Sequence, residues 1–365
     1  MKRIGIGALT LLCCFSLCGC NLTVMERQTF ALCMSVDLEK DGGLTLSVQT
    51  PMNGSGTSSA ATPEYTVFSA TGESFAAALA LLAASTPCAL NFCQLKLCVV
   101  GYELAAGQPL RELITQLAHL PTMRPSAMVM IALGSGEEIL KSQKPDFGMR
   151  MSTHLNIYMD RLANLELSPS VTIMECLREL EGGRIDALLP IGAVNAKVKE
   201  KNTPQSQGSG GEEKKQQEAA TVFSGGEPWS ESLLEEGLIA GTLPRTGDDP
   251  VEYLGSAAVG QDWVTGLLTA EETQTLLRVK KEAQLSVAMA GESTQLQVWL
   301  PQSRGETLNL PLEEIQRILC KLQAMDCDAL GFGEAFAAMS ATNGDWRGMN
   351  SRDRYRTGQF YVNRR

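Results

Sequence analysis

Aromatic residues and histidine are scarce in this sequence, and the motifs of the common enzyme classes are missing. Of the 365 residues, 5% are aromatic and two are histidines, His119 and His154. No HExxH, GxSxG or P-loop motif occurs. Neither histidine has a catalytic partner nearby in the sequence, and His119 lies at the end of a predicted helix, which favours a packed or surface role. We therefore predict no catalytic residues, no cofactor and no metal site, and we expect a protein that is not an enzyme.

Two Gly-X-Gly segments and one acidic pair do not indicate a site either. Residues 134–136 and 331–333 lack the rest of any nucleotide-binding fingerprint, and we predict turns at both. Glu271 and Glu272 fall in the first turn of a predicted helix capped by Thr269, where carboxylates favour the helix dipole. We therefore interpret these segments as turns and a helix start, and we predict no catalytic or ligand-binding role for them.

Positive charge is also in short supply. The chain has 31 Lys and Arg against 41 Asp and Glu, a net charge of −10. Without Lys2 and Arg3, the 31 basic residues become 29 against 41 acidic ones, a net charge of −12. Binding to nucleic acid needs clustered basic residues and is excluded. Electrostatic docking on anionic lipid is disfavoured for the same reason, so attachment to a membrane must be covalent.

A long hydrophobic segment is missing, because the apolar run 4–17 is too short to cross a bilayer comfortably. The run follows a basic start, as in a secretory signal. Leu17 at −3, Gly19 at −1 and Cys20 at +1 resemble the lipobox of bacterial lipoproteins. We predict a signal peptide over residues 1–19, cleavage between Gly19 and Cys20, and a lipidated Cys20 whose two acyl chains anchor stably. A plain secretory signal or a signal anchor is the alternative.

Seven of the eleven cysteines remain once the signal and the lipidated residue are set aside. An odd number cannot pair completely within one chain, and no CxxC motif or zinc spacing occurs. We expect most to be small buried hydrophobic residues, with one or two disulfides possible outside the cytoplasm. The seven are Cys33, Cys88, Cys93, Cys98, Cys176, Cys320 and Cys327.

The remaining patterns predict an α+β chain with mixed sheets flanked by helices. Apolar runs bounded by turn residues predict strands, and apolar residues at helical spacing predict helices. The predicted strands are residues 29–36, 44–50, 65–70, 91–100, 127–133, 238–242, 256–259, 283–289, 294–300 and 358–363. The predicted helices are residues 72–84, 110–120, 136–141, 171–181, 269–277 and 312–325, the last opened by Pro311 at its first helical position.

Composition divides the chain into a signal and three predicted domains. After the signal peptide at 1–19, we predict an N-terminal α/β domain at 20–150 and a middle domain at 151–280. Gly, Ser, Gln, Lys and Glu dominate about 196–232, which predicts a disordered insertion in the middle domain. A C-terminal α/β domain at 281–365 completes the chain.

Four stretches of the sequence resemble one known family, and the third is the most specific of them. They are Gly19-Cys20 with Glu26-Arg27 and the strand ending at Asp37; residues 72–75 and 92–105; residues 255–277; and residues 328–334 with Trp346. In order and spacing they resemble the Ger(x)C-type spore germination proteins, the C-subunit lipoproteins of nutrient germinant receptors in spore-forming Firmicutes.

The resemblance implies a non-catalytic subunit made of three α/β-type domains. Such a subunit is tethered through Cys20 to the outer face of the inner spore (cytoplasmic) membrane. It assembles with two integral-membrane partners, the A and B subunits of the receptor. The complex senses nutrients such as amino acids or sugars and triggers release of ions and dipicolinic acid.

The sequence departs from the family in three places. Asn21 stands where the family usually has tryptophan, and Gln94 where histidine is common. The predicted third domain is shortened between Leu300 and Pro311, and the sequence stops at Arg365, soon after its last predicted strand.

Two other classes of protein stay open. A solute-binding lipoprotein of a transporter needs two lobes around a ligand cleft, but aromatic anchors are few here and no hinge pattern is evident. A cell-envelope hydrolase is the weaker alternative, because candidate bases are missing.

Overall fold

The computed structural model describes residues 27–52, 65–145, 149–198, 237–245, 247, 249–290, 293–301, 311–342 and 350–364. The predicted signal peptide, nearly all of the Gly/Ser/Thr-rich segment 51–63 and most of the predicted insertion 196–232 lie outside these residues. Among the helices of the described ranges, none combines the length and the apolar character that a membrane span requires.

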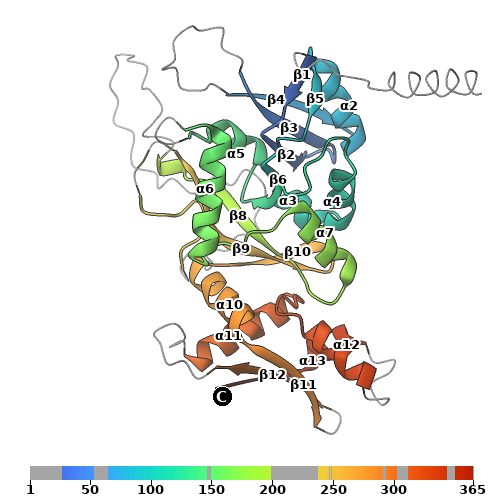
Figure 1. Cartoon of the computed structure of the whole chain (residues 1–365), viewed down its shortest axis with the longest axis vertical. Coiled ribbons are helices and arrows are strands. Elements are labelled where there is room, and N and C mark those ends of the chain that lie inside the picture. The colour runs from blue at the N-terminus through green and yellow to red at the C-terminus, as the bar shows by residue number, and fades with distance from the viewer. Residues whose placement is uncertain are drawn as a thin grey trace, which may run out of the picture.

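A mixed eight-stranded sheet, in the order β10-β9-β8-β7-β6-β2-β3-β4, forms the centre of the molecule (Figure 1). The four middle strands, β8, β7, β6 and β2, run parallel to one another. At one end β9 is antiparallel to β8 and β10 to β9, and at the other end β3 is antiparallel to β2 and β4 to β3. The strands are β2 (Cys33–Leu38), β3 (Leu44–Pro51), β4 (Tyr65–Gly72), β6 (Leu97–Gly101), β7 (Met128–Ala132), β8 (Leu188–Val194), β9 (Val251–Gly260) and β10 (Trp263–Leu268).

Helices cover both faces of this sheet, which explains why its middle strands are nearly continuous apolar runs. The larger core lies on the face covered by α2 (Phe75–Ser85), α3 (Tyr102–Gly107), α4 (Leu110–Ala118) and α7 (Ile173–Gly182). The opposite face packs against α5 (Gly136–Ser142) and α6 (Met151–Asn164). The α+β class predicted from the sequence is confirmed.

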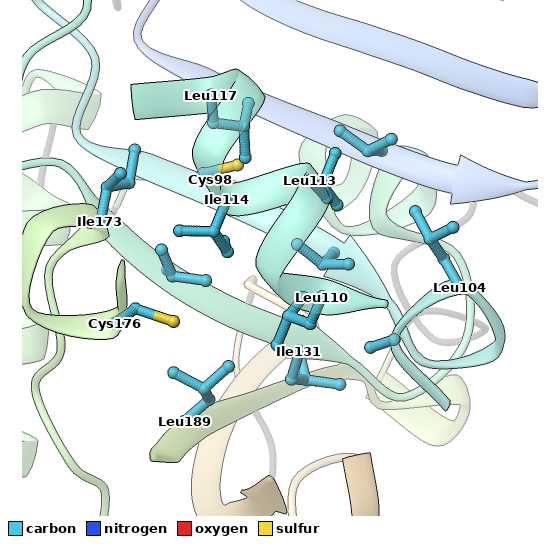
Figure 2. Close-up of a cluster of buried hydrophobic side chains, with 14 of the residues drawn as sticks. Cys98, Leu104, Leu110, Leu113, Ile114, Leu117, Ile131, Ile173, Cys176 and Leu189 are labelled. Carbon is cyan, nitrogen blue, oxygen red and sulfur yellow. The ribbon is translucent and has the colours of Figure 1, made fainter. Parts of the chain in front are cut away.

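Helix α4 shows how the predicted apolar spacing builds this core. Its buried residues are Leu110, Leu113, Ile114 and Leu117, which recur every three or four positions and therefore share one helix face. Figure 2 shows them gathered above the sheet, together with residues such as Ile131 of β7. The helix predicted at 110–120 is therefore confirmed, ending two residues earlier than expected.

The C-terminal part of the chain adds a second, three-stranded sheet and its own core. The strands predicted at 283–289 and 294–300, whose alternating patterns suit a hairpin, are confirmed as the antiparallel pair β11 (Gln284–Ala290) and β12 (Ser293–Leu300), and β13 (Gln359–Arg364) lies parallel to β12. Four helices pack here: α10 (Ala270–Glu282), α11 (Leu312–Ala324), α12 (Phe332–Thr342) and α13 (Ser351–Thr357). The core also takes in Leu188, Ala258 and Leu268 from β8, β9 and β10, so it is continuous with the large sheet.

Three predicted strands differ from the structure. The strand expected at 29–36 is divided into β1 (Gln28–Phe30) and β2. The strand expected at 91–100 is divided into β5 (Ala89–Asn91), which pairs with β1 (Gln28–Phe30), and β6. Residues 238–242 were expected to form a strand and instead form a turn. The backbone N–H of Ala240 donates to the Leu254 carbonyl of β9 at 3.1 Å, but the bonds on either side of it do not continue a ladder. The N–H of Gly241 donates to the Glu252 carboxylate at 2.7 Å, and that of Thr242 turns back to the Ile239 carbonyl at 3.2 Å.

Several elements have no counterpart among the predictions. Of the described elements, those that no predicted strand or helix range covers are α3, α6, α12, α13, β8 and β10. The large sheet draws strands from both sides of residue 150, and α10 leads from it into the second sheet. The domain boundaries at 150 and 280 remain predictions.

Candidate functional site

The predicted lipidation site lies just ahead of the described fold. Gly19 and Cys20 fall outside the described residues, which begin at Arg27. From there the chain enters β1 at Gln28, so few residues separate Cys20 from the first strand. The structure gives no account of the anchor itself.

The two histidines lie on opposite faces of the large sheet. His119 follows α4, is exposed, and has its Nδ1 2.7 Å from the carbonyl oxygen of Thr115. His154 is buried in α6, with its Nε2 3.5 Å from Asp249 Oδ2. The structure therefore brings no second histidine to either one, and the surface role predicted for His119 agrees with its position.

Four of the seven cysteines of the described residues are buried. Burial raises the pKa of Cys98 to about 12, and burial also raises the pKa values of Cys33, Cys176 and Cys327. A thiol held neutral in this way is a poor nucleophile and a poor metal ligand. These four act as small apolar residues in the cores.

Three of the stretches that carry the family resemblance contain residues that connect separate elements of the fold. Asp37 makes the first of these connections. Its carboxylate accepts hydrogen bonds from the backbone N–H groups of Gly136 and Glu137, at 2.7 and 3.0 Å, at the start of α5. Gly101 and Gly136 lie so close to Asp37 that a Cβ on either would approach its Oδ1, at 2.6 and 3.3 Å. Burial raises the pKa of Asp37, and the two N–H donors oppose that shift.

A second connection of this kind links the large sheet to the C-terminal core. Asp328 accepts hydrogen bonds from the three N–H groups of residues 331–333, at 3.0, 2.9 and 2.7 Å, as α12 begins. Asp186, just before β8, accepts the N–H of Asp328 at 2.7 Å and a bond from Arg352 of α13 at 3.2 Å. Burial raises the pKa of Asp328 to about 6, although the N–H donors favour its ionised form.

The predicted turn at 331–333 is only partly correct. Gly331 has a φ of +93° and forms the turn, but Phe332 and Gly333 already belong to α12. Gly333 passes so close to Arg184 that a Cβ would lie 2.5 Å from the Arg184 carbonyl oxygen. Glycine is therefore required by the close approach of two backbones.

The third connection is at the start of α10, which contacts α11. Thr269 and Glu272 form a complete capping box, with bonds of 3.3 and 3.2 Å between side chain and backbone. The Glu272 side chain is also contacted from α11 by Arg317 at 3.1 Å and Lys321 at 2.6 Å. Glu271 instead accepts the N–H of Leu238 at 3.2 Å. The prediction that the two glutamates are not an acid pair agrees with these separate roles.

Among the cavities on the surface of the described residues, two lie beside helices of the large sheet. The larger, about 340 Å³, lies between α7 and α10 and is lined by charges of both signs, including Arg178, Glu179 and Lys280. Burial raises the pKa of Glu179, and Lys280 and Arg178 oppose that shift. The smaller, about 180 Å³, has an apolar floor and the carboxylates of Glu73 and Glu112 among its lining. Neither lining includes a histidine or a cysteine.

The features described so far are contacts at helix starts and between distant elements. Within the described ranges, no group of three His, Cys, Asp or Glu side chains is placed to hold a metal ion. Sequence reasoning missed Asp186, Arg352 and Glu252, whose importance depends on partners far away in the chain. No sequence signal marked them, because long-range pairing is visible only in the fold.

Comparison with known proteins identifies the N-terminal part of the chain. Residues 22–194 match the family model described as the spore germination protein N-terminal domain. No curated protein matches the chain. A solved structure entitled "Crystal Structure of the GerBC protein" has 12% sequence identity and a TM-score of 0.40, over 91% of this chain and 95% of its own.

Proposed function

Because this chain is a Ger(x)C-type spore germination protein, we propose that it is the lipid-anchored, non-catalytic C subunit of a nutrient germinant receptor. The observation that carries the proposal is the family match, which begins at residue 22. That start lies directly after the lipobox-like Gly19-Cys20, so the family domain follows the predicted anchor without an intervening segment.

In this proposal the mature chain is held by Cys20 on the outer face of the inner spore membrane. Its partners are the two integral-membrane subunits, A and B, of the receptor. The ligand sites lie mainly on those subunits, and this chain stabilises the complex or relays its state. A continuous core and an ionic joint between the large sheet and the C-terminal part suit that role, because they let the two parts move as one.

Co-purification from spore membranes tests the proposal directly. The lipidated wild-type chain should bring down two multi-pass subunits, and Cys20→Ala should lose or deplete them. Cys320→Ala is the matched control, because Cys320 is an exposed cysteine on α11 with no proposed membrane role. A transporter permease in place of the two subunits would favour the solute-binding alternative, and recovery of neither would refute the receptor assignment.

Deletion of the chain tests the relay role. We expect the deletion to abolish or strongly slow germination in response to the nutrient of its receptor, measured as loss of optical density and release of dipicolinic acid. Nutrient germination at the wild-type rate would show that the chain is dispensable and would contradict the proposed role.

A further inference from the structure

One stretch of the chain is free of charge although it lies largely at the surface. Residues 74–95 contain no Asp, Glu, Lys or Arg, in a chain where 20% of residues are charged. The stretch comprises α2, the turn after it, and β5. Ser74 caps α2, and the next charged residue is Lys96, before β6.

The solvent side of α2 is unusual for a surface helix. Phe75, Ala78 and Leu82 are buried against the large sheet. Apart from Ser85 at the end of the helix, the exposed residues are alanines and Leu81, which is 52% exposed. A surface helix normally presents charged or polar residues to water, as α11 does with Arg317 and Glu313. The apolar solvent side of α2 therefore indicates a surface that is covered in the working protein.

The position of α2 relative to the predicted anchor suggests what covers it. The stretch ends in β5, which pairs in parallel with β1, from Gln28↔Ala89 to Phe30↔Asn91. Cys20 precedes Gln28 by eight residues, which span at most ~28 Å when fully extended. A lipid-anchored chain therefore keeps β1, β5 and α2 close to the bilayer.

The overall arrangement agrees with this placement. Figure 1 shows α2, β1 and β5 at one end of the longest axis, with β11, β12 and α13 at the other. The mature chain carries a net charge of −12, obtained from 29 basic and 41 acidic residues, and anionic lipid repels such a protein. A neutral surface next to the anchor is the part of the molecule that can approach such a bilayer without repulsion.

We propose that the exposed side of α2 rests on the lipid bilayer when Cys20 is lipidated, with Leu81 at the boundary between headgroups and acyl chains. This inference rests on the anchor of the proposed function. The lipid and the helix then form two points of attachment, which fix the orientation of the protein on the membrane. The C-terminal sheet is held away from the bilayer surface, at the far end of the long axis.

Fluorescence quenching by brominated lipid tests this orientation. The lipidated full chain is bound to vesicles of phosphatidylcholine and phosphatidylglycerol, either plain or brominated on the acyl chains. Leu81→Trp is compared with Ile157→Trp, a control at a matched apolar position that is 53% exposed on α6. The wild type supplies the background of its four native tryptophans.

We expect the emission added by Leu81→Trp to fall about twofold in brominated vesicles, because an interfacial helix is buried about 5–10 Å. The emission added by Ile157→Trp should not fall. Equal quenching at the two positions would overturn the contact but leave the anchor intact. So would an absence of quenching at position 81 while the chain floats with the vesicles. If the wild type failed to float with the vesicles, as we expect of Cys20→Ala, both the contact and the anchor would be overturned.

A photo-crosslinker at position 81 separates the bilayer from a protein partner. In spore membranes, adducts with lipid are expected. An adduct with another polypeptide, together with no quenching in vesicles, would overturn the bilayer contact and assign this face of α2 to a protein. Circular dichroism and thermal unfolding of each variant verify that it is folded. With the crosslinker moved to Ala84, which is exposed on the same helix, a folded Leu81→Glu that abolishes the lipid adduct would support the contact independently.

Discussion

Buried carboxylates in this protein are held by backbone N–H groups and by cations from distant parts of the chain. Asp37 and Asp328 accept hydrogen bonds from backbone N–H groups at helix starts. Glu252 is fully buried, and it accepts hydrogen bonds from two backbone N–H groups and from the side chains of Asn195 and Arg245. A buried charge without such partners costs several kcal/mol, on the order of the free energy of unfolding itself. These residues are therefore the positions where a small change has a large effect.

Asp328 should make stability depend on pH. Its folded-state pKa is raised to about 6 from 3.8, so between these values the folded state keeps a proton that the unfolded state has lost. The free energy of unfolding should therefore fall as the pH rises from about 4 to about 6, by up to about 3 kcal/mol. Urea unfolding at several pH values measures it. In Asp328→Asn this part of the pH dependence should vanish, and an unchanged profile would contradict the assignment.

Glu252→Gln should destabilise the protein strongly. The amide cannot accept the bonds that one carboxylate oxygen now takes, and Arg245, 2.9 Å from Oε1, loses its anionic partner. We expect a loss of about 3–5 kcal/mol in the free energy of unfolding, measured with urea. Glu112→Gln, the same change at an exposed position on α4, is the control and should stay within about 0.5 kcal/mol. Equal effects for the two variants would refute the prediction.

At the scale of single elements, local chemistry is readable from the sequence where neighbours supply both partners. The start of α10 was predicted from Thr269 and the two glutamates after it, and the structure confirms a capping box there. Residues 238–242 were misassigned because their apolar pattern suits a strand, whereas the N–H groups of Leu238 and Gly241 are taken up by the side chains of Glu271 and Glu252. Local patterns thus predict caps and amphipathic helices, and they fail where a distant side chain replaces a neighbouring strand.

Removing the cap of α10 gives a test at this scale. Thr269→Ala deletes the hydroxyl that accepts the N–H of Glu272, and we expect the free energy of unfolding to fall by about 1 kcal/mol. Thr269→Ser keeps the hydroxyl and should retain most of the stability. Thermal and urea unfolding compare the three proteins. A Ser variant as unstable as the Ala variant would show that packing, not capping, is what matters.

For the whole molecule, the contact between the large sheet and the C-terminal core is both apolar and ionic. Arg352 reaches across it to Asp186, and Leu188, Ala258 and Leu268 enter the second core. Because neither contribution is local in sequence, the contact could not be anticipated from the chain. It is the feature that would let the two parts respond together.

Arg352→Met should loosen that contact. Without the guanidinium, Asp186, whose side chain is 7% exposed, loses its cationic partner, and we expect a loss of about 3 kcal/mol. Hydrogen exchange should rise in residues 327–333 and 351–357 before it rises in the large sheet. Arg356→Met is the control, because its exposed side chain pairs with Asp326 inside the C-terminal part, and it should leave exchange at Asp186 unchanged. Identical exchange patterns in both variants would argue against a coupling role for Arg352.

The sequence by itself determined the α+β class, most helix positions, the C-terminal hairpin and the family, because each rests on short-range periodicity, caps, turns and ordered motifs. It also carries the lipobox-like signal at Cys20, which is a local pattern. Only the tertiary structure decided that strands from residue 33 to residue 268 join in one sheet. It also decided that Asp186 meets Arg352 and that β5, at the end of the uncharged stretch, pairs with the first strand. These facts depend on which distant segments pack together, and that is set by the summed burial and pairing of the whole chain rather than by any one stretch of it.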